Sequence, residues 1–163
     1  MILKSLIDNL KAQVEWHQLL HQVLVMEAQE IGPRSSLSDI EDVLSQRDRI
    51  SERIQGLEQG RLKMVTAFIR EHQLEPDSNL EAIAAKAPEA EAKLLKELKS
   101  SLLGLMEPIQ AQARENARRA QNRANCFSEV SNSLHKTFKR QPTYSQYGKV
   151  NQPKGALFLE KSV

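Results

Sequence analysis

The chain has 163 residues, of which 40% are apolar and 4% aromatic, and it contains six glycines and six prolines. This length suits one domain, and the scarcity of aromatic, glycine and proline residues argues against a fold built from strands and tight turns. The net charge of +2 is divided unevenly, because residues 1–108 carry 13 Lys and Arg against 18 Asp and Glu, whereas residues 109–163 carry 10 against 3. The basic final third should attract either the acidic body or an acidic partner.

The sequence also indicates where the protein works. No apolar run approaches the roughly 20 residues that a membrane span needs, and residues 1–16 lack the apolar core and cleavage site of a signal peptide. The single cysteine, Cys126, cannot form an internal disulfide. We therefore expect a cytoplasmic protein.

Residues 2–30 show the apolar spacing of a first long helix. One face gathers most of its apolar side chains: Leu3, Leu6, Leu10, Val14, Leu20 and Leu24. Gly32 and Pro33 end this helix. Because the loop that follows is short, the second helix should return antiparallel to the first.

A second long helix begins at Ser35 or Ser36 and continues to about His72. Either serine can cap it, although Ser38 with Glu41 also fits a capping box. The apolar line of this helix consists of Leu37, Ile40, Leu44, Ile50, Ile54, Leu57, Met64 and Phe68. Such a line predicts one face that packs against the first helix.

Two glycines within the second helix and the segment that follows it interrupt the helical pattern. Gly56 and Gly60 weaken the second helix by roughly 1 kcal/mol each relative to alanine, so we expect a close-packed neighbour at these positions. Residues 73–87 break the long-helix pattern and contain one short connecting helix, which Asp77 or Ser78 can cap.

A third and longest helix runs from Pro88 to about Lys139, and Pro108 inside it predicts a kink or a one-turn break. Its apolar or small residues are Leu98, Leu102, Met106, Ile109, Ala113, Ala117, Ala120, Ala124, Phe127, Leu134 and Phe138. The alanines in the middle should let a neighbour approach closely or leave a shallow groove. Together the elements predict an all-α fold, an elongated antiparallel three-helix bundle over residues 1–140 with a short connecting helix.

Residues 141–163 have a different composition. Two prolines, two glycines and many small polar residues without an apolar period predict a flexible tail. The tail contains both tyrosines of the chain, Tyr144 and Tyr147, and its end includes the apolar sequence ALFLE. Because exposed apolar runs usually dock, we expect residues 155–163 to pack back on the bundle.

No arrangement in the sequence predicts catalysis, a bound cofactor or a metal site. His17 and His21 share one helical face, but no glutamate follows the first histidine as a metalloprotease motif requires, and no further ligands stand nearby. Cys126 lies in mid-helix, without a neighbouring base that would activate its thiolate. We therefore interpret the protein as a non-enzymatic binding module.

A basic, amide-rich stretch leaves two other functions open. Its arginines are Arg114, Arg118, Arg119 and Arg123. A helical RNA-binding protein would use this patch, although the patch lacks aromatic residues and the acidic body can neutralise it. A self-associating coiled-coil scaffold would instead use the apolar line of the third helix.

Three segments of the chain resemble the FlgN family of flagellar export chaperones. They are Leu57-Glu58-x-x-Arg61 in the second helix, Gln-Ala-Arg-Glu-Asn116-Ala-Arg-Arg in the third, and Thr143-Tyr144-Ser-Gln-Tyr147-Gly148 in the tail. The resemblance implies a cytoplasmic chaperone that binds the disordered C-terminal ends of hook-associated proteins and delivers them to the type III export gate. It implies neither catalysis nor a cofactor.

The resemblance also gives roles to two sets of residues. The cargo anchors that we predict recur at steps of three and four: Phe127, Val130, Leu134 and Phe138. The same four residues could instead form an intramolecular core. In the family the tyrosine segment is implicated in docking on the export gate, so we expect Tyr144 and Tyr147 to serve there. If residues 155–163 occupy the bundle's groove in the free protein, cargo would compete with them and release the tyrosines.

Overall fold

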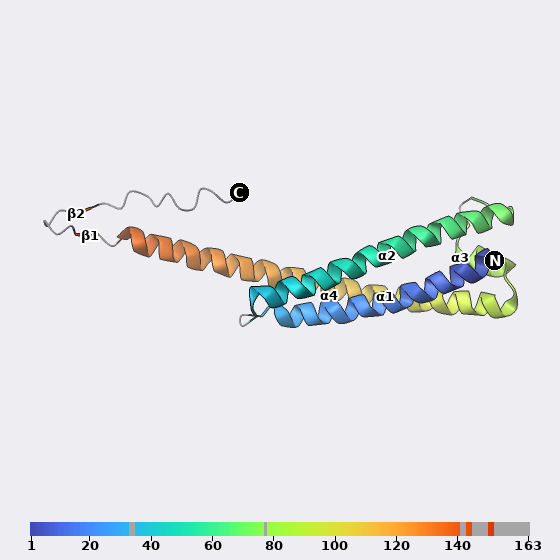
Figure 1. Cartoon of the computed structure of the whole chain (residues 1–163), viewed down its shortest axis with the longest axis horizontal. Helices are drawn as coiled ribbons and strands as arrows, with labels where there is room; N and C mark the ends of the chain where they lie inside the picture. The colour runs from blue at the N-terminus through green and yellow to red at the C-terminus, as the bar shows by residue number, and fades with distance from the viewer. Residues whose placement is uncertain (33–34, 77, 141–142, 145–149, 152–163) are drawn as a thin grey trace. The chain divides into compact units, whose positions relative to one another are not determined.

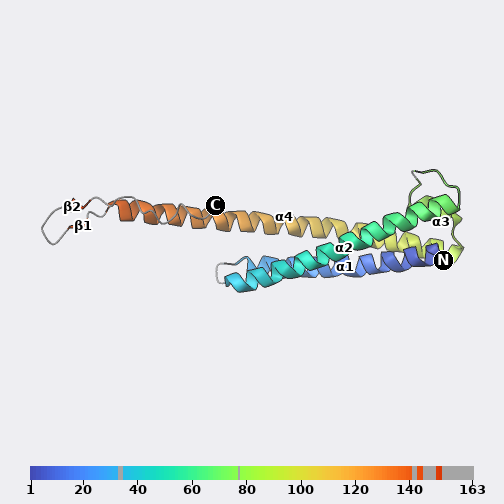
Figure 2. The same ribbon diagram turned by 45° about the horizontal axis from the view of Figure 1, so that its top comes forward.

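The computed structural model describes residues 1–32, 35–76, 78–140, 143–144 and 150–151, with side chains described as far as Lys136. The described residues form helices α1 (Ile2–Glu30), α2 (Leu37–Glu71), α3 (Leu80–Lys86) and α4 (Glu89–Arg140), and strands β1 (Thr143–Tyr144) and β2 (Val150–Asn151) (Figures 1 and 2). Three long helices and a short one pack together, so the all-α prediction is confirmed. No described helix combines the length and hydropathy that a membrane span requires.

By its internal contacts the chain falls into two compact units, Met1–Ala120 and Gln121–Val163. The first unit contains α1, α2, α3 and the first part of α4, and the second contains the rest of α4 and both strands. The division that the sequence predicted, a bundle over 1–140 and a tail over 141–163, stays a prediction.

In the first unit α1 and α2 form an antiparallel hairpin, as the short loop predicted. Residue numbers rise along α1 as those of their partners fall along α2: Asn9 with Leu57, Trp16 with Arg53, and Glu27 with Arg47. Helix α4 instead runs parallel to α1. Asn116 Nδ2 donates to Leu24 O at 2.7 Å, and Arg119 Nη1 donates to Ala28 O at 3.0 Å. Residue numbers therefore rise together along α1 and α4, as they do in parallel helices.

Asn9 makes a close contact between α1 and α2. Its Nδ2 donates to Leu57 O at 3.1 Å, and a Cβ added at Gly60 would lie 3.3 Å from that nitrogen. A Cβ added at Gly56 would meet no atom within 4 Å. The predicted close packing is therefore confirmed at Gly60 and wrong at Gly56, whose outer face is open.

Both ends of α2 have specific caps. Ser36 Oγ accepts from the backbone amide of Asp39 at 3.1 Å, and the Asp39 carboxylate accepts from the Ser36 amide at 3.3 Å, so the capping box starts at Ser36 and not at Ser38. At the other end Gln73 has φ 51°, and the next amide donates to Ile69 O at 3.0 Å. This is the bond pattern of a Schellman motif, with glutamine where glycine is usual.

The remaining helix predictions need two corrections. Asn79, not Asp77 or Ser78, caps α3, because its Oδ1 accepts from two backbone amides of the first turn at 3.0 and 3.1 Å. Helix α4 continues through Pro108, so of the predicted kink or one-turn break the break is wrong and the kink stays a prediction. The carbonyl that proline leaves unbonded belongs to Gly104, an exposed residue with no side chain, where solvent can satisfy it.

Two clusters form the core of the first unit. The first unites all four helices near the N-terminus, where α3 also lies (Figures 1 and 2): Leu6, Ile7, Leu10, Phe68, Ile83, Ala84 and Leu95. The second belongs to α1 and α2 alone: Val23, Val43 and Ile50. Helix α4 is thus joined to α2 through the core at one end only.

The second unit contains the two strands found among the described residues. Strands β1 and β2 pair antiparallel, with Thr143 opposite Asn151 and Tyr144 opposite Val150. The sequence analysis placed no strands there. Threonine, tyrosine and valine favour extended backbone, but two residues a strand are too few to signal a ladder by periodicity.

Candidate functional site

Two clefts follow one another along a single face of α1, between α2 on one side and α4 on the other. The first has a volume of about 490 Å³, and its walls include Ile54 of α2 and Leu103 and Met106 of α4. The second has a volume of about 440 Å³, and its walls include Arg47 of α2 and Ala113 of α4. We call the two together the α2–α4 groove. Its floor on α1 is Leu10, Gln13, His17, Leu20, Leu24 and Glu27.

The alanines of α4 line this groove. Ala113, Ala117 and Ala120 are exposed and belong to the wall of the second cleft. Of the two outcomes expected for them, close approach of a neighbour or a shallow groove, the groove is the one observed.

The groove floor is partly polar, which the sequence analysis did not foresee. Gln13 and His17 are buried. Gln13 Nε2 donates to Asn9 Oδ1 at 2.9 Å, and His17 Nδ1 donates to Gln13 O at 2.7 Å. Across the groove Arg61 Nε donates to Glu58 Oε2 at 2.8 Å, and this bond holds the pKa of the Glu58 carboxyl below its ordinary value.

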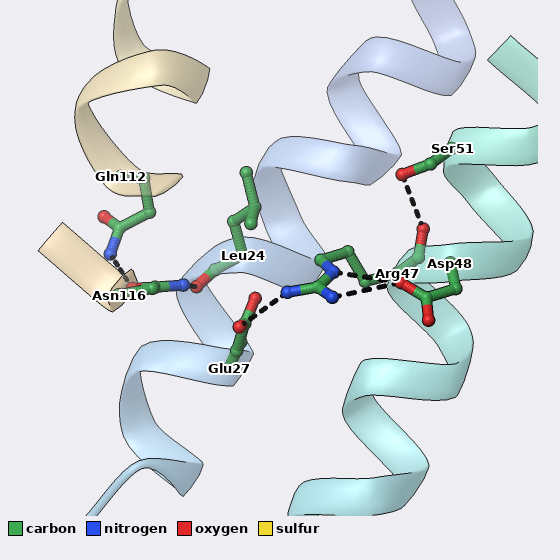
Figure 3. Close-up of polar contacts among 7 residues, drawn as sticks. All are labelled: Leu24, Glu27, Arg47, Asp48, Ser51, Gln112 and Asn116. Carbon is green, nitrogen blue, oxygen red and sulfur yellow. Dashed lines mark hydrogen bonds and ion pairs between the residues drawn. The ribbon is translucent and has the colours of Figure 1, made fainter. Parts of the chain in front are cut away.

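A second polar group lies farther along the floor (Figure 3). Glu27 is 5% exposed, and its Oε1 accepts from Arg47 Nη1 at 3.0 Å. Arg47 also contacts the exposed Asp48 at 3.0 Å. On the α4 side the buried Asn116 donates to Leu24 O and accepts from Gln112 Nε2 at 2.9 Å.

One atom of this group has no partner. Glu27 Oε2 is buried without a hydrogen bond among the described residues. A buried carboxylate oxygen without a donor costs about 1–3 kcal/mol or more, so a hydrogen bond to this oxygen would be stabilising. The signal in the sequence was a glutamate in line with Leu20 and Leu24, at a step that otherwise places apolar residues.

The predicted cargo anchors belong to the second unit. Phe127, Val130 and Leu134 are 77%, 58% and 53% exposed. None of the three is therefore part of a packed core among the described residues. The fourth anchor, Phe138, lies in α4 beyond the last described side chain. Of the tyrosines, Tyr144 has a described backbone only, in β1, and Tyr147 lies outside the described residues, as do residues 155–163.

The basic patch is partly paired with its own chain. Arg118 and Arg119 both donate to Glu115 at 2.9 Å, and these bonds lower the pKa of the Glu115 carboxyl to about 2. Arg119 also donates to Ala28 O on α1. These two arginines already have protein acceptors, which weakens the case for an RNA-binding surface.

The histidines and the cysteine considered for metal binding or nucleophilic chemistry belong to different units. Among the described residues no group of three or more His, Cys, Asp or Glu side chains is placed to hold a metal ion. His17 is buried and His21 half-buried on α1, and Cys126 is exposed in the second unit.

Comparison with known proteins identifies a family. A family model described as FlgN protein matches residues 1–152, which include every described helix and strand. No curated protein and no solved structure matches the chain significantly.

Proposed function

Because the chain belongs to the FlgN family, the flagellar export chaperones of the hook-associated proteins, we propose that it binds its cargo on the exposed apolar face of α4. The family is cytoplasmic and non-enzymatic, and its cargoes are the hook-associated proteins FlgK and FlgL. The proposal names the segment bound, the C-terminal end of the cargo, and the residues that bind it: Phe127, Val130, Leu134 and Phe138.

The exposure of three of these side chains supports the proposal. Phe127, Val130 and Leu134 are three and four residues apart, so they lie on one face of α4. Full burial of such a side chain contributes about 1.5–3 kcal/mol, and a partner helix that covers all three gains a large part of that sum. Amphipathic helices bind apolar rows of this kind with their own apolar face.

The experiment introduces a charge on this face and, as its control, on the opposite face of the same helix. Val130→Asp places a carboxylate between the anchors, whereas Asn132→Asp adds the same charge two residues on, about 200° around the helix. Both positions are exposed, so circular dichroism should show unchanged helix content. Isothermal titration with a purified hook-associated protein should give a Kd at least ~10-fold weaker for Val130→Asp, and an unchanged Kd for Asn132→Asp.

Two results would overturn the assignment of this face. Equal cargo affinity for both variants places the cargo elsewhere. Loss of helix content in Val130→Asp makes Val130 part of the core, as the sequence analysis had left open. Light scattering on the same samples tests the scaffold alternative, in which Val130→Asp would lower the mass in solution and leave cargo binding intact.

We propose further that Tyr144 and Tyr147 dock on the export gate. The support is the resemblance of the segment that contains them to the tyrosine segment of the family. Tyr144→Ala and Tyr147→Ala should reduce secretion of hook-associated proteins in an export assay and leave the cargo Kd unchanged. Normal secretion by the double variant would contradict this role.

A further inference from the structure

The first unit is open on one side along most of its length. The core cluster that unites all four helices ends near Leu10, and the next cluster contains residues of α1 and α2 alone. Beyond that point α2 and α4 are the walls of the α2–α4 groove and α1 is its floor. Four-helix bundles close such an opening with a fourth helix.

The groove has the dimensions of a helix. Its floor runs from Leu10 to Glu27, which at about 1.5 Å per residue is ~26 Å, the length of a helix of about 17 residues. The two clefts, of about 490 and 440 Å³, offer space for apolar side chains in register along it. Exposed alanines on the α4 wall permit close approach, because the distance between packed helices is set by the side chains at the contact.

Glu27 specifies the polar part of the occupant. One carboxylate oxygen pairs with Arg47 at 3.0 Å, and the other is buried without a donor. The residue belongs to the lining of the second cleft. Arg47 is shared with Asp48, but Asp48 is exposed and screened by solvent, so Arg47 chiefly balances the buried charge of Glu27. The donor that we expect is therefore a neutral hydroxyl or amide rather than a second cation.

We propose that the α2–α4 groove binds one amphipathic helix of the hook-associated cargo, which completes a four-helix bundle and donates a side-chain hydroxyl or amide hydrogen bond to Glu27 Oε2. The proposal rests on the chaperone function and adds a second cargo surface to the α4 face at Phe127–Leu134. The cargo helix needs apolar residues at steps of three and four, and one Ser, Thr, Asn or Gln in line with them.

The first test fills the groove. Ala113→Trp places an indole in the second cleft, and Ala111→Trp places the same side chain on another face of α4, outside the lining of the clefts. Both alanines are exposed, so both variants should keep the helix content of the wild type. Titration with full-length hook-associated protein should show at least ~10-fold weaker binding for Ala113→Trp than for Ala111→Trp. Equal affinities would overturn the proposal.

The second test addresses the hydrogen bond. Glu27→Leu removes the acceptor at similar volume and leaves Arg47 beside Asp48, at an exposed position where water can also reach it. Loss of a hydrogen bond to a charged group weakens binding by roughly 10- to 100-fold. An unchanged cargo Kd would show that the cargo donates no hydrogen bond to Glu27, and it would refute that part of the proposal.

A photo-crosslinking residue at position 113 identifies the occupant directly. A crosslink to the hook-associated protein supports the proposal. With cargo present at a saturating concentration, a crosslink to a second copy of the chain, or to residues 155–163 of the same chain, overturns it. The proposals for the two cargo surfaces can be refuted independently. Weak cargo binding by Val130→Asp together with normal cargo binding by Ala113→Trp refutes the groove proposal and leaves the α4 face as the cargo site.

Discussion

Replacing Arg47 by methionine removes the ion-pair partner of Glu27 and leaves a carboxylate in a position that is 5% exposed. Over the 3.0 Å between Arg47 Nη1 and Glu27 Oε1, two unit charges attract by about 5.5 kcal/mol at an effective dielectric constant near 20, and by about 1.4 kcal/mol in bulk water. The Arg47 side chain is 35% exposed, so the pair lies between these limits. We expect Arg47→Met to lower the free energy of unfolding by about 2–3 kcal/mol.

A double-mutant cycle isolates this interaction. In a Glu27→Leu background the buried charge is absent, so Arg47→Met should cost less than ~0.5 kcal/mol and the coupling energy should be about 2 kcal/mol. Urea unfolding can be followed by the fluorescence of the single tryptophan, Trp16, which packs against the α1–α2 cluster of the same hairpin, and by circular dichroism. Coincident transitions would justify a two-state treatment.

The control uses the other acidic partner of Arg47. Asp48 makes a bond of the same length, 3.0 Å, but its side chain is 64% exposed, and an exposed pair contributes about 0–1 kcal/mol. Asp48→Asn should therefore change stability far less than Arg47→Met does. A coupling energy below ~0.5 kcal/mol between Glu27 and Arg47 would refute the reasoning, because it would mean that Glu27 is solvated in the folded chain.

Three further predictions concern the rest of the first unit. Leu95→Ala should lower the free energy of unfolding by about 2–5 kcal/mol in urea titrations because Leu95 is fully buried, whereas Leu103→Ala, 62% exposed on the same helix, should change it by less than ~0.5 kcal/mol; similar losses would refute the core assignment. Gln73→Gly should raise the free energy of unfolding in urea titrations by about 0.5–1 kcal/mol, because glycine adopts the positive φ at the end of α2 without strain. An unchanged free energy of unfolding would argue against that conformation. The Glu115 carboxyl should titrate with a pKa of about 2 by NMR and with a higher pKa in Arg118→Gln, which keeps only the Arg119 bond. Its stabilising contribution should be complete above pH 4.5 and decline as pH falls toward 2; a wild-type pKa near 4.5 would refute the pairing.

The order and type of the helices could be predicted because they depend on local sequence. Apolar spacing located the long helices to within about a residue at most ends, and Gly32 with Pro33 marked the first turn. The errors arose where two local solutions compete. Asp77, Ser78 and Asn79 can all cap a helix, and only the position of the first turn of α3 decides among them.

The alanines of α4 left a shallow groove as one of two expected outcomes, but the extent and the floor of the groove could not be predicted, because they depend on which helix faces remain uncovered. An apolar line on α4 looks the same in sequence whether the side chains pack inside the chain, as Leu95 does, or stay exposed, as Phe127 does. Helical periodicity gives the direction of a side chain and not its partner. Polar residues in the line of α1, such as Gln13 and Glu27, were the local sign that this face is not a closed core.

These polar residues give the open groove a physical rationale. A wholly apolar floor of this length would be an aggregation risk in a free chaperone, whereas Gln13, His17 and Asn116 are hydrogen-bonded within the chain and tolerate an empty groove. Glu27 Oε2 is the exception, because only an added donor satisfies it. A cargo helix with a donor in that place gains the hydrogen bond that the free chain lacks, about 1.5–3 kcal/mol for a bond to a charged group, whereas a helix without a donor leaves the oxygen unpaired. The same atom that the fold leaves unsatisfied would therefore discriminate against helices that are merely apolar, which is specificity by an unpaired group in the wrong complex.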